Sequence, residues 1–178
     1  NRRQRQMCIR DRVNQVGMVP PEPDDHTAPV EKQRWQTLVE VLTDIGLHGQ
    51  RCGARLAAST GTEPGDNLNA LLAAVPEASI AVNFDPGNLI INGYSAIESL
   101  QQLGSHVAHF HVRDAVRDLA RGRGLEVEVG RGTADFPELL SVLMTHSHID
   151  EIMIRDPNQA HLNTYERCTF SEKSPALD

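Results

Sequence analysis

The sequence predicts an α/β fold built on a parallel sheet, because short apolar runs alternate with amphipathic stripes along the chain. With 178 residues, 39% of them hydrophobic, the chain can bury one core. About five strands and four helices are expected in the order βαβαβαβαβ, which requires right-handed crossovers between parallel strands. The expected strands are residues 13–19, 54–59, 80–85, 107–113 and 149–155. An open five-stranded sheet is one arrangement of these elements, and part of a closed barrel is the other.

The clearest βαβ unit runs from Ser79 to Asp114. In its first strand, Ile80, Val82 and Phe84 alternate with Ala81, Asn83 and Asp85. In its second strand, a period of two places Val107, His109, His111 and Arg113 on one side and Ala108, Phe110 and Val112 on the other. The unit therefore brings an aspartate and a histidine to equivalent strand ends, and the two histidines share one face of their strand.

Four helices are predicted from apolar residues at helical spacing. The first begins near Pro29, carries Trp35 and Leu42 in its stripe, and ends near Gly46 and Gly49. The second has Asp66 as its N-cap and stops at Pro76, and the third, with Ile97, Leu100 and Leu103, stops at Gly104. The fourth spans 133–145 with Pro137 in its first turn, and we expect Phe136, Leu139, Leu140 and Leu143 to point inward.

The two ends differ in composition from the rest. Residues 1–12 are basic and without periodicity, so we expect a non-native or disordered tail. Residues 13–157 form the expected domain, residues 158–178 an irregular segment, and residues 113–131 a long loop. The net charge of −7 argues against nucleic-acid binding, and no apolar run approaches a membrane span. Three cysteines without paired spacing predict free thiols and a cytoplasmic protein.

Three segments carry a resemblance to a known family. VNFDPGNLI, HVAHFHVRDAVRD and VGRGTADFPELLSVL resemble consecutive parts of the xylose-isomerase-like (β/α)8 TIM barrels, the sugar phosphate isomerase/epimerase family. The resemblance implies a partial TIM barrel containing about strands 4 to 8 with their helices. A whole barrel needs about 250 residues, so we expect a fragment of a longer barrel. Pairing of two half-barrels would protect the sheet edges, which makes a homo-oligomer a further expectation.

The resemblance also implies a divalent-metal site, for Mn²⁺ or Mg²⁺, at the C-terminal mouth of the barrel. The family holds the ion with two glutamates, an aspartate and a histidine, and Asp85 and His111 match the last two. Ser59 and Arg155 stand where the family has its glutamates. Arginine has no lone pair for a metal and its charge repels one. Glu63 and Asp156 are nearby carboxylates that a small shift in register would make available as substitutes.

The loops after the expected strands hold the candidate substrate-binding residues. By resemblance these are Asn88, Arg113, Asp114, Arg117 and Arg155. His109 is expected to be a packed barrel histidine, and Gly130-Arg131-Gly132 is a weak signal for an anion cradle. No residue is assigned a catalytic role.

Three functions follow as hypotheses. The first is a metal-dependent sugar or sugar-phosphate isomerase/epimerase of carbohydrate metabolism, or a related inosose-type dehydratase, implied by the resemblance with Asp85 and His111. The alternative is a non-catalytic or repurposed barrel that binds a small anionic sugar ligand without metal, favoured by Ser59 and Arg155. The third, an endonuclease acting at abasic sites, needs several metal ions and many ligands. The acidic composition argues against it.

Overall fold

A computed structural model describes residues 11–76, 79–118, 122–146, 151–155 and 165–168. Its main sheet has six strands in the order β1-β2-β3-β4-β7-β8. The first five pair in parallel and β8 is antiparallel to β7. The strands are β1 (Asp11–Asn14), β2 (Arg55–Ser59), β3 (Ile80–Phe84), β4 (Val107–Val112), β7 (Glu151–Arg155) and β8 (Tyr165–Cys168). The predicted α/β class with a parallel sheet is confirmed.

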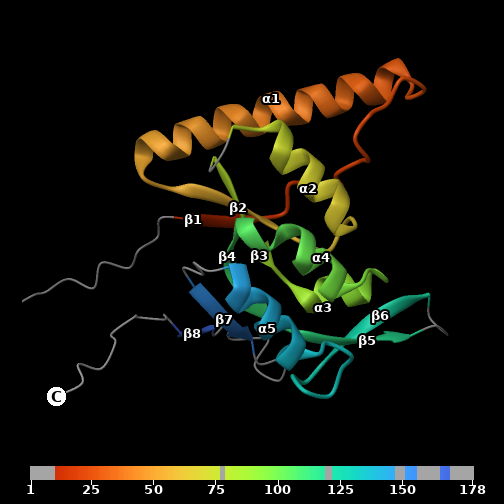
Figure 1. Cartoon of the computed structure of the whole chain (residues 1–178), viewed down its shortest axis with the longest axis vertical. Coiled ribbons are helices and arrows are strands. Elements are labelled where there is room, and N and C mark those ends of the chain that lie inside the picture. The colour runs from red at the N-terminus through yellow and green to blue at the C-terminus, as the bar shows by residue number, and fades with distance from the viewer. Residues whose placement is uncertain (1–10, 77–78, 119–121, 147–150, 156–164, 169–178) are drawn as a thin grey trace, which may run out of the picture.

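Helices connect the parallel strands and follow one another along the sheet from orange to blue (Figure 1). The long ones are α1 (Pro29–Cys52), α2 (Gly65–Ala74), α4 (Ala96–Leu103) and α5 (Phe136–His146). Two short elements join them, α3 (Pro86–Ile91) directly after β3 and a 3₁₀ turn, η1 (Gly104–His106), directly after α4. Within the part of the chain that is described, no helix is long and apolar enough to cross a membrane.

The main core lies between the sheet and these helices. Phe84 on β3 and Phe110 on β4 stack with ring centroids 5.6 Å apart, and both side chains are fully buried. Their helix-side partners in the core include Leu68, Leu100 and Leu139. A second cluster of buried residues consists of Ala57, Ala81 and Ala108 alone. Side chains along β2 and β3 alternate between the two faces of the sheet. Small side chains therefore occupy the face opposite the main core.

An irregularity between β3 and β4 corrects the predicted faces of two residues. The pairing steps from Val82 with Val107 to Asn83 with His109, so β4 has one extra residue at this point. Val107 therefore packs in the main core and Ala108 in the alanine cluster, opposite to the prediction. From His109 onward the predicted alternation holds, because Phe110 is in the main core.

The predicted helix ends and inward-facing positions are confirmed only in part. Asp66 lies in the first turn of α2, whose N-cap is Pro64, so its predicted capping role is wrong. The helix α4 ends at Leu103 with Gly104 as its C-cap, as predicted, but Gly104 has φ −52° and ψ −38° and begins the 3₁₀ turn η1 instead of adopting a left-handed conformation. Leu140, predicted to point inward, is 39% exposed, whereas Leu139 and Leu143 are buried as predicted.

The segment predicted as a long loop contains a hairpin. Strands β5 (Asp114–Asp118) and β6 (Arg123–Val127) pair in antiparallel fashion beside α3 (Figure 1). A Cβ on Gly124 would lie 2.6 Å from Ile91 Cα, so this close approach to α3 requires glycine. Strands also extend into both expected terminal segments: β1 begins at Asp11, and β8 falls within residues 158–178. Residues 1–10 lie outside the described part.

Candidate functional site at the carboxyl ends of the strands

Asp85 follows the last residue of β3 and caps the next helix. Its Oδ1 accepts a hydrogen bond of 2.8 Å from the backbone N–H of Asn88, in the first turn of α3. An aspartate before Pro-Gly is a favourable start for a helix, because Pro86 fixes the first helical φ and the carboxylate satisfies a free N–H group. The residue is only 3% exposed. The sequence therefore fixes this carboxylate at the mouth, the edge formed by the carboxyl ends of the parallel strands.

His111 and Arg113 approach Asp85 from the neighbouring strand end. His111 Nδ1 lies 3.1 Å from Asp85 Oδ2, and Arg113 Nη1 lies 2.9 Å from the same oxygen. Since residues 109, 111 and 113 share one face of an extended chain, the spacing in HFHVRD delivers both groups to one carboxylate. The sequence prediction that Asp85 and His111 share a strand-end face is confirmed by this contact.

The electrostatics of the cluster favour an ionised Asp85. Burial alone would raise the pKa of this carboxyl group, but the hydrogen bond from His111 and the charge of Arg113 outweigh it and hold the pKa below 3.8. Arg113 has a raised pKa because hydrogen bonds and charge interactions with Glu126 and Asp85 outweigh its own burial. Asp85 and Arg113 therefore both carry charge at neutral pH.

Arg113 also connects the strand end to the hairpin. Its Nη2 donates a hydrogen bond of 2.5 Å to Glu126 Oε2 on β6. Its Nη1 reaches Asn88 Oδ1 at 3.3 Å. The Nε atom is buried and makes no hydrogen bond within the described part of the chain. One guanidinium thus joins β3, α3 and the hairpin, and Glu126 enters the site without having been singled out in the sequence.

Thr60, directly after β2, is a second residue that sequence reasoning missed. Its Oγ1 accepts from the backbone N–H of Asp85 at 2.9 Å, and its carbonyl oxygen accepts from Asn88 Nδ2 at 3.3 Å. The side chain is 1% exposed. Its position immediately after a buried strand was the available signal, since strand-end residues of parallel sheets meet at one edge. Thr60 positions Asp85 and Asn88 relative to each other.

Ser59, which replaces a family carboxylate, is engaged by its neighbour on β3. Ser59 pairs in register with Asn83, and Asn83 Nδ2 donates to Ser59 Oγ at 3.0 Å. Asn83 pairs on its other side with His109, which is 5% exposed. These three residues form a polar row across β2, β3 and β4, in which Asn83 and His109 are buried and Ser59 is half-buried. The burial of His109 agrees with the expectation of a packed barrel histidine.

Asp114 is used to hold a loop. It is fully buried, and its two oxygens accept hydrogen bonds from the backbone N–H groups of Ala115, Gly130, Gly132 and Ala134. A Cβ on Gly132 would overlap the Asp114 carboxylate, so only glycine fits there. The Gly-Arg-Gly motif therefore wraps an anion of the chain itself, and Asp114 fixes the loop between β6 and α5.

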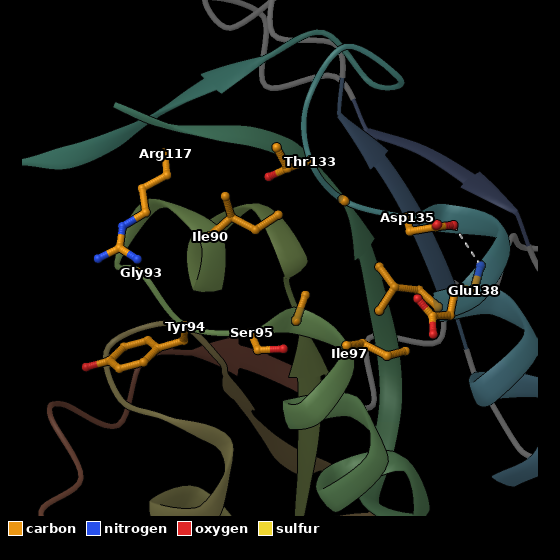
Figure 2. Close-up of a pocket in the computed structure, with 12 residues that line it drawn as sticks. Ile90, Gly93, Tyr94, Ser95, Ile97, Arg117, Thr133, Asp135 and Glu138 are labelled. Carbon is orange, nitrogen blue, oxygen red and sulfur yellow. Dashed lines mark hydrogen bonds between the residues drawn. The ribbon is translucent and has the colours of Figure 1, made fainter. Parts of the chain in front are cut away.

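Arg117 lies at a different cavity from Asp85 and His111. This cavity, about 400 Å³, is formed by the α3–α4 connection, the hairpin and the start of α5. Figure 2 shows Arg117 above Gly93 at one end, with Asp135 and Glu138 at the other. Asp85, Asn88, His111 and Arg113 do not line it. The structure thus brings together Asn88 and Arg113 but separates Arg117 from them.

The residues at the mouth do not fit the four-ligand metal site implied by the resemblance. No group of three or more His, Cys, Asp or Glu able to hold an ion occurs in the ranges that the structure describes. Glu63, a candidate substitute, accepts instead from Thr62 Oγ1 and from Val19 N. Arg155 ends β7, which pairs with β4, and Asp156 lies outside the described residues. A guanidinium already binds the Asp85 oxygen that an ion would need.

A parallel strand-and-helix repeat with polar groups gathered at the carboxyl ends of its strands defines part of a TIM-barrel protein. The chain belongs to the Xylose isomerase-like TIM barrel family, whose sequence model matches residues 6–163. This family assignment confirms the resemblance seen in the sequence.

Individual relatives agree with the family. Inosose dehydratase of Clostridium perfringens is 22% identical over 142 residues, which cover 70% of this chain and 48% of that protein. A xylose isomerase domain protein from Planctomyces limnophilus has 25% identity and a TM-score of 0.70, covering 84% of this chain and 53% of that structure. The IOLI protein, solved with a zinc atom, has 20% identity and a TM-score of 0.61, covering 77% and 53%. The chain spans about half the length of the curated relatives that it matches.

Proposed function

We propose that this chain supplies the strand-end site of a sugar-modifying enzyme of the isomerase/epimerase class, acting on a small sugar-like molecule. The observation that carries the proposal is the buried Asp85–His111 pair, with Nδ1 and Oδ2 3.1 Å apart at the mouth of the sheet. A carboxylate beside an imidazole orients the ring and supports its positive form when it takes a proton. TIM-barrel enzymes carry their chemistry at the carboxyl ends of the strands, and membership of the family, with its inosose dehydratase relative, supports the proposal.

The proposed chemistry is proton transfer at a carbon next to a carbonyl group. His111 takes the proton from that C–H bond, whose electron pair forms a C=C bond while the carbonyl π electrons move to oxygen. Return of the proton to the other face gives an epimer, and return to the neighbouring carbon, with a proton transferred between oxygens, gives an aldose–ketose isomer. Asn88 and Arg113 flank the pair and are the proposed substrate contacts, with Arg155 at the end of β7. Asp85 stays ionised and orients His111.

Solvent deuterium exchange tests this proposal. The purified chain is incubated in D₂O with aldoses, ketoses, inososes and their phosphates, and proton NMR follows loss of the signal next to the carbonyl. We expect exchange with at least one sugar, and its loss in His111→Gln. The matched control is His48→Gln, because His48 is an exposed histidine on α1. Exchange that survives His111→Gln would remove His111 from the proposed role.

The same geometry favours a second candidate, a barrel that binds a small anionic sugar ligand without turning it over. The permanent charge of Arg113 at the mouth suits a phosphate or carboxylate group. This candidate predicts that a sugar phosphate raises the melting temperature while no sugar in the panel exchanges a proton. The exchange experiment therefore separates the two.

A further inference from the structure

The Arg113 guanidinium joins two carboxylates in the way a divalent cation would. Nη1 contacts Asp85 Oδ2 at 2.9 Å, and Nη2 contacts Glu126 Oε2 at 2.5 Å. The Nδ1 atom of His111 lies 3.1 Å from that same oxygen of Asp85. Two carboxylates therefore contact one arginine side chain, and a histidine contacts one of these carboxylates. Aspartate, glutamate and histidine are typical ligands of divalent ions.

We propose that Arg113 takes the place of the divalent cation at this mouth and keeps the ion out. Guanidinium is permanently charged and has no lone pair, so it can neutralise Asp85 and Glu126 but cannot share a metal with them. An ion bound to Asp85 Oδ2 would lie within a few Å of this positive charge, with only 11% of the arginine side chain exposed to solvent for screening. This inference rests on the proposed function only in treating Asp85 and His111 as the site.

The surroundings of Asp85 support the exclusion. Asn88 N donates to the other oxygen, so both oxygens of Asp85 are already engaged. The hydroxyl of Ser59 accepts a hydrogen bond from Asn83 rather than facing an ion as a carboxylate would. Glu63 is bonded to Thr62 and Val19. Within the described part of the chain, Asp85 and His111 match family ligands, and Arg113 compensates for the charge of Asp85 and Glu126.

Removal of the guanidinium should therefore create a metal site. In Arg113→Gln, Asp85, His111 and Glu126 would face one another without a positive charge between them. We expect the wild-type melting temperature to be unchanged by millimolar Mn²⁺, and that of Arg113→Gln to rise. Mn²⁺ affinity in the variant should be about tenfold or more above wild type, because charge repulsion has been removed. The rise should vanish when Asp85→Asn is added to Arg113→Gln.

Two controls accompany this variant. Arg131→Gln removes an arginine whose side chain is 77% exposed and which pairs only with Glu128 among described contacts, so it should gain no Mn²⁺ response. Arg113→Lys keeps the positive charge and should also gain none. A wild-type rise with Mn²⁺ that Asp85→Asn abolishes would overturn the inference. An Arg113→Gln chain that melts cooperatively without responding to Mn²⁺ would overturn it too.

A second measurement tests the inference even if Arg113→Gln does not fold, because it uses the wild-type chain. The water-proton relaxation rate reports directly on Mn²⁺ bound to wild type. An enhanced rate with wild type that is lost in His111→Gln would contradict the inference. The absence of such an enhancement would support it. The sugar-exchange assay distinguishes this result from the proposed function. Exchange of a sugar proton that requires Mn²⁺ would refute the proposed role of Arg113 but not the proposed enzyme. A chain that binds no Mn²⁺ and exchanges no sugar proton would refute the enzyme and leave the role of Arg113 standing.

Discussion

Arg113 Nη1 lies 2.9 Å from Asp85 Oδ2, and this contact links two strand ends that are 28 residues apart in sequence. Because the arginine also holds Glu126, the hairpin and the end of β3 are fixed by one side chain. The ion pair is mostly shielded from water, which makes it stronger than a surface pair but costly if only one partner is removed.

Ionised Asp85 should stabilise the folded chain, and this contribution should be lost at acidic pH. Its folded pKa is lowered and its unfolded value is near 3.8, so the stability it contributes is present above pH 3.8 and is lost as pH falls through the folded pKa. Melting temperatures measured from pH 2 to 7 should therefore show the largest difference between wild type and Asp85→Asn near neutrality. A difference that is constant over this range would contradict the lowered pKa.

Glu63 should have the opposite effect. Burial raises its pKa, and the hydrogen bonds from Thr62 and Val19 only partly offset this. The folded state then holds the proton more tightly than the unfolded state, so stability falls as pH rises from about 4.5 through the folded pKa. Glu63→Gln should raise the melting temperature at pH 7 relative to wild type more than at pH 4. Exposed Glu40→Gln is the control, and an equal response in both variants would count against this account.

Asp114 should matter for folding through the loop it binds. Asparagine has the same shape but only one oxygen acceptor and no charge, so Asp114→Asn loses part of a set of four backbone hydrogen bonds. Hydrogen bonds to charged groups contribute about 1.5–3 kcal/mol each, and we expect a loss of about 2 kcal/mol or more in urea unfolding. Asp44→Asn, on the exposed side of α1, should change the free energy of unfolding by less than about 0.5 kcal/mol. Equal values for the two variants would rule out this role.

Two adjacent leucines on α5 provide a test of the core. Leu139 is 1% exposed and Leu140 is 39% exposed, although both lie in the same apolar run. Leu139→Ala should cost about 2–5 kcal/mol because it leaves a cavity, whereas Leu140→Ala should cost well under about 1 kcal/mol. Chemical denaturation of the two variants measures the difference, and similar losses would mean that α5 packs with another face.

The sequence predicted the sheet well because its strands are short apolar runs between helices with clear stripes. It also predicted that Asp85 and His111 would meet, since alternation along a strand determines which residues share a face. The predicted faces of Val107 and Ala108 were wrong because one extra residue in β4 changes the register. No local sequence pattern indicates such an irregularity.

The rest of the site depends on contacts between distant segments. Residues 113–131 looked irregular because the hairpin is charged and rich in glycine, yet Gly124 is there to let it approach α3. Glu126 joins the site only through this packing, so it could not be found from spacing alone. Thr60 joins the site through Asp85, and its position directly after a buried strand was the one signal for it. Asp114 was named as a substrate contact by resemblance, and the sequence did not show that its carboxylate accepts hydrogen bonds from four backbone N–H groups of the chain itself.

The central claim is that the Asp85–His111 mouth binds a small sugar-like molecule, and a ligand-dependent thermal melt tests it most directly. A ligand at one hundred times its dissociation constant adds about 2.7 kcal/mol to the stability of the folded state. In a panel of sugars and sugar phosphates with EDTA present, at least one compound should raise the melting temperature of wild type and of His48→Gln, and should raise that of Asn88→Ala less. No rise with any compound, or an equal rise in Asn88→Ala, would contradict the claim.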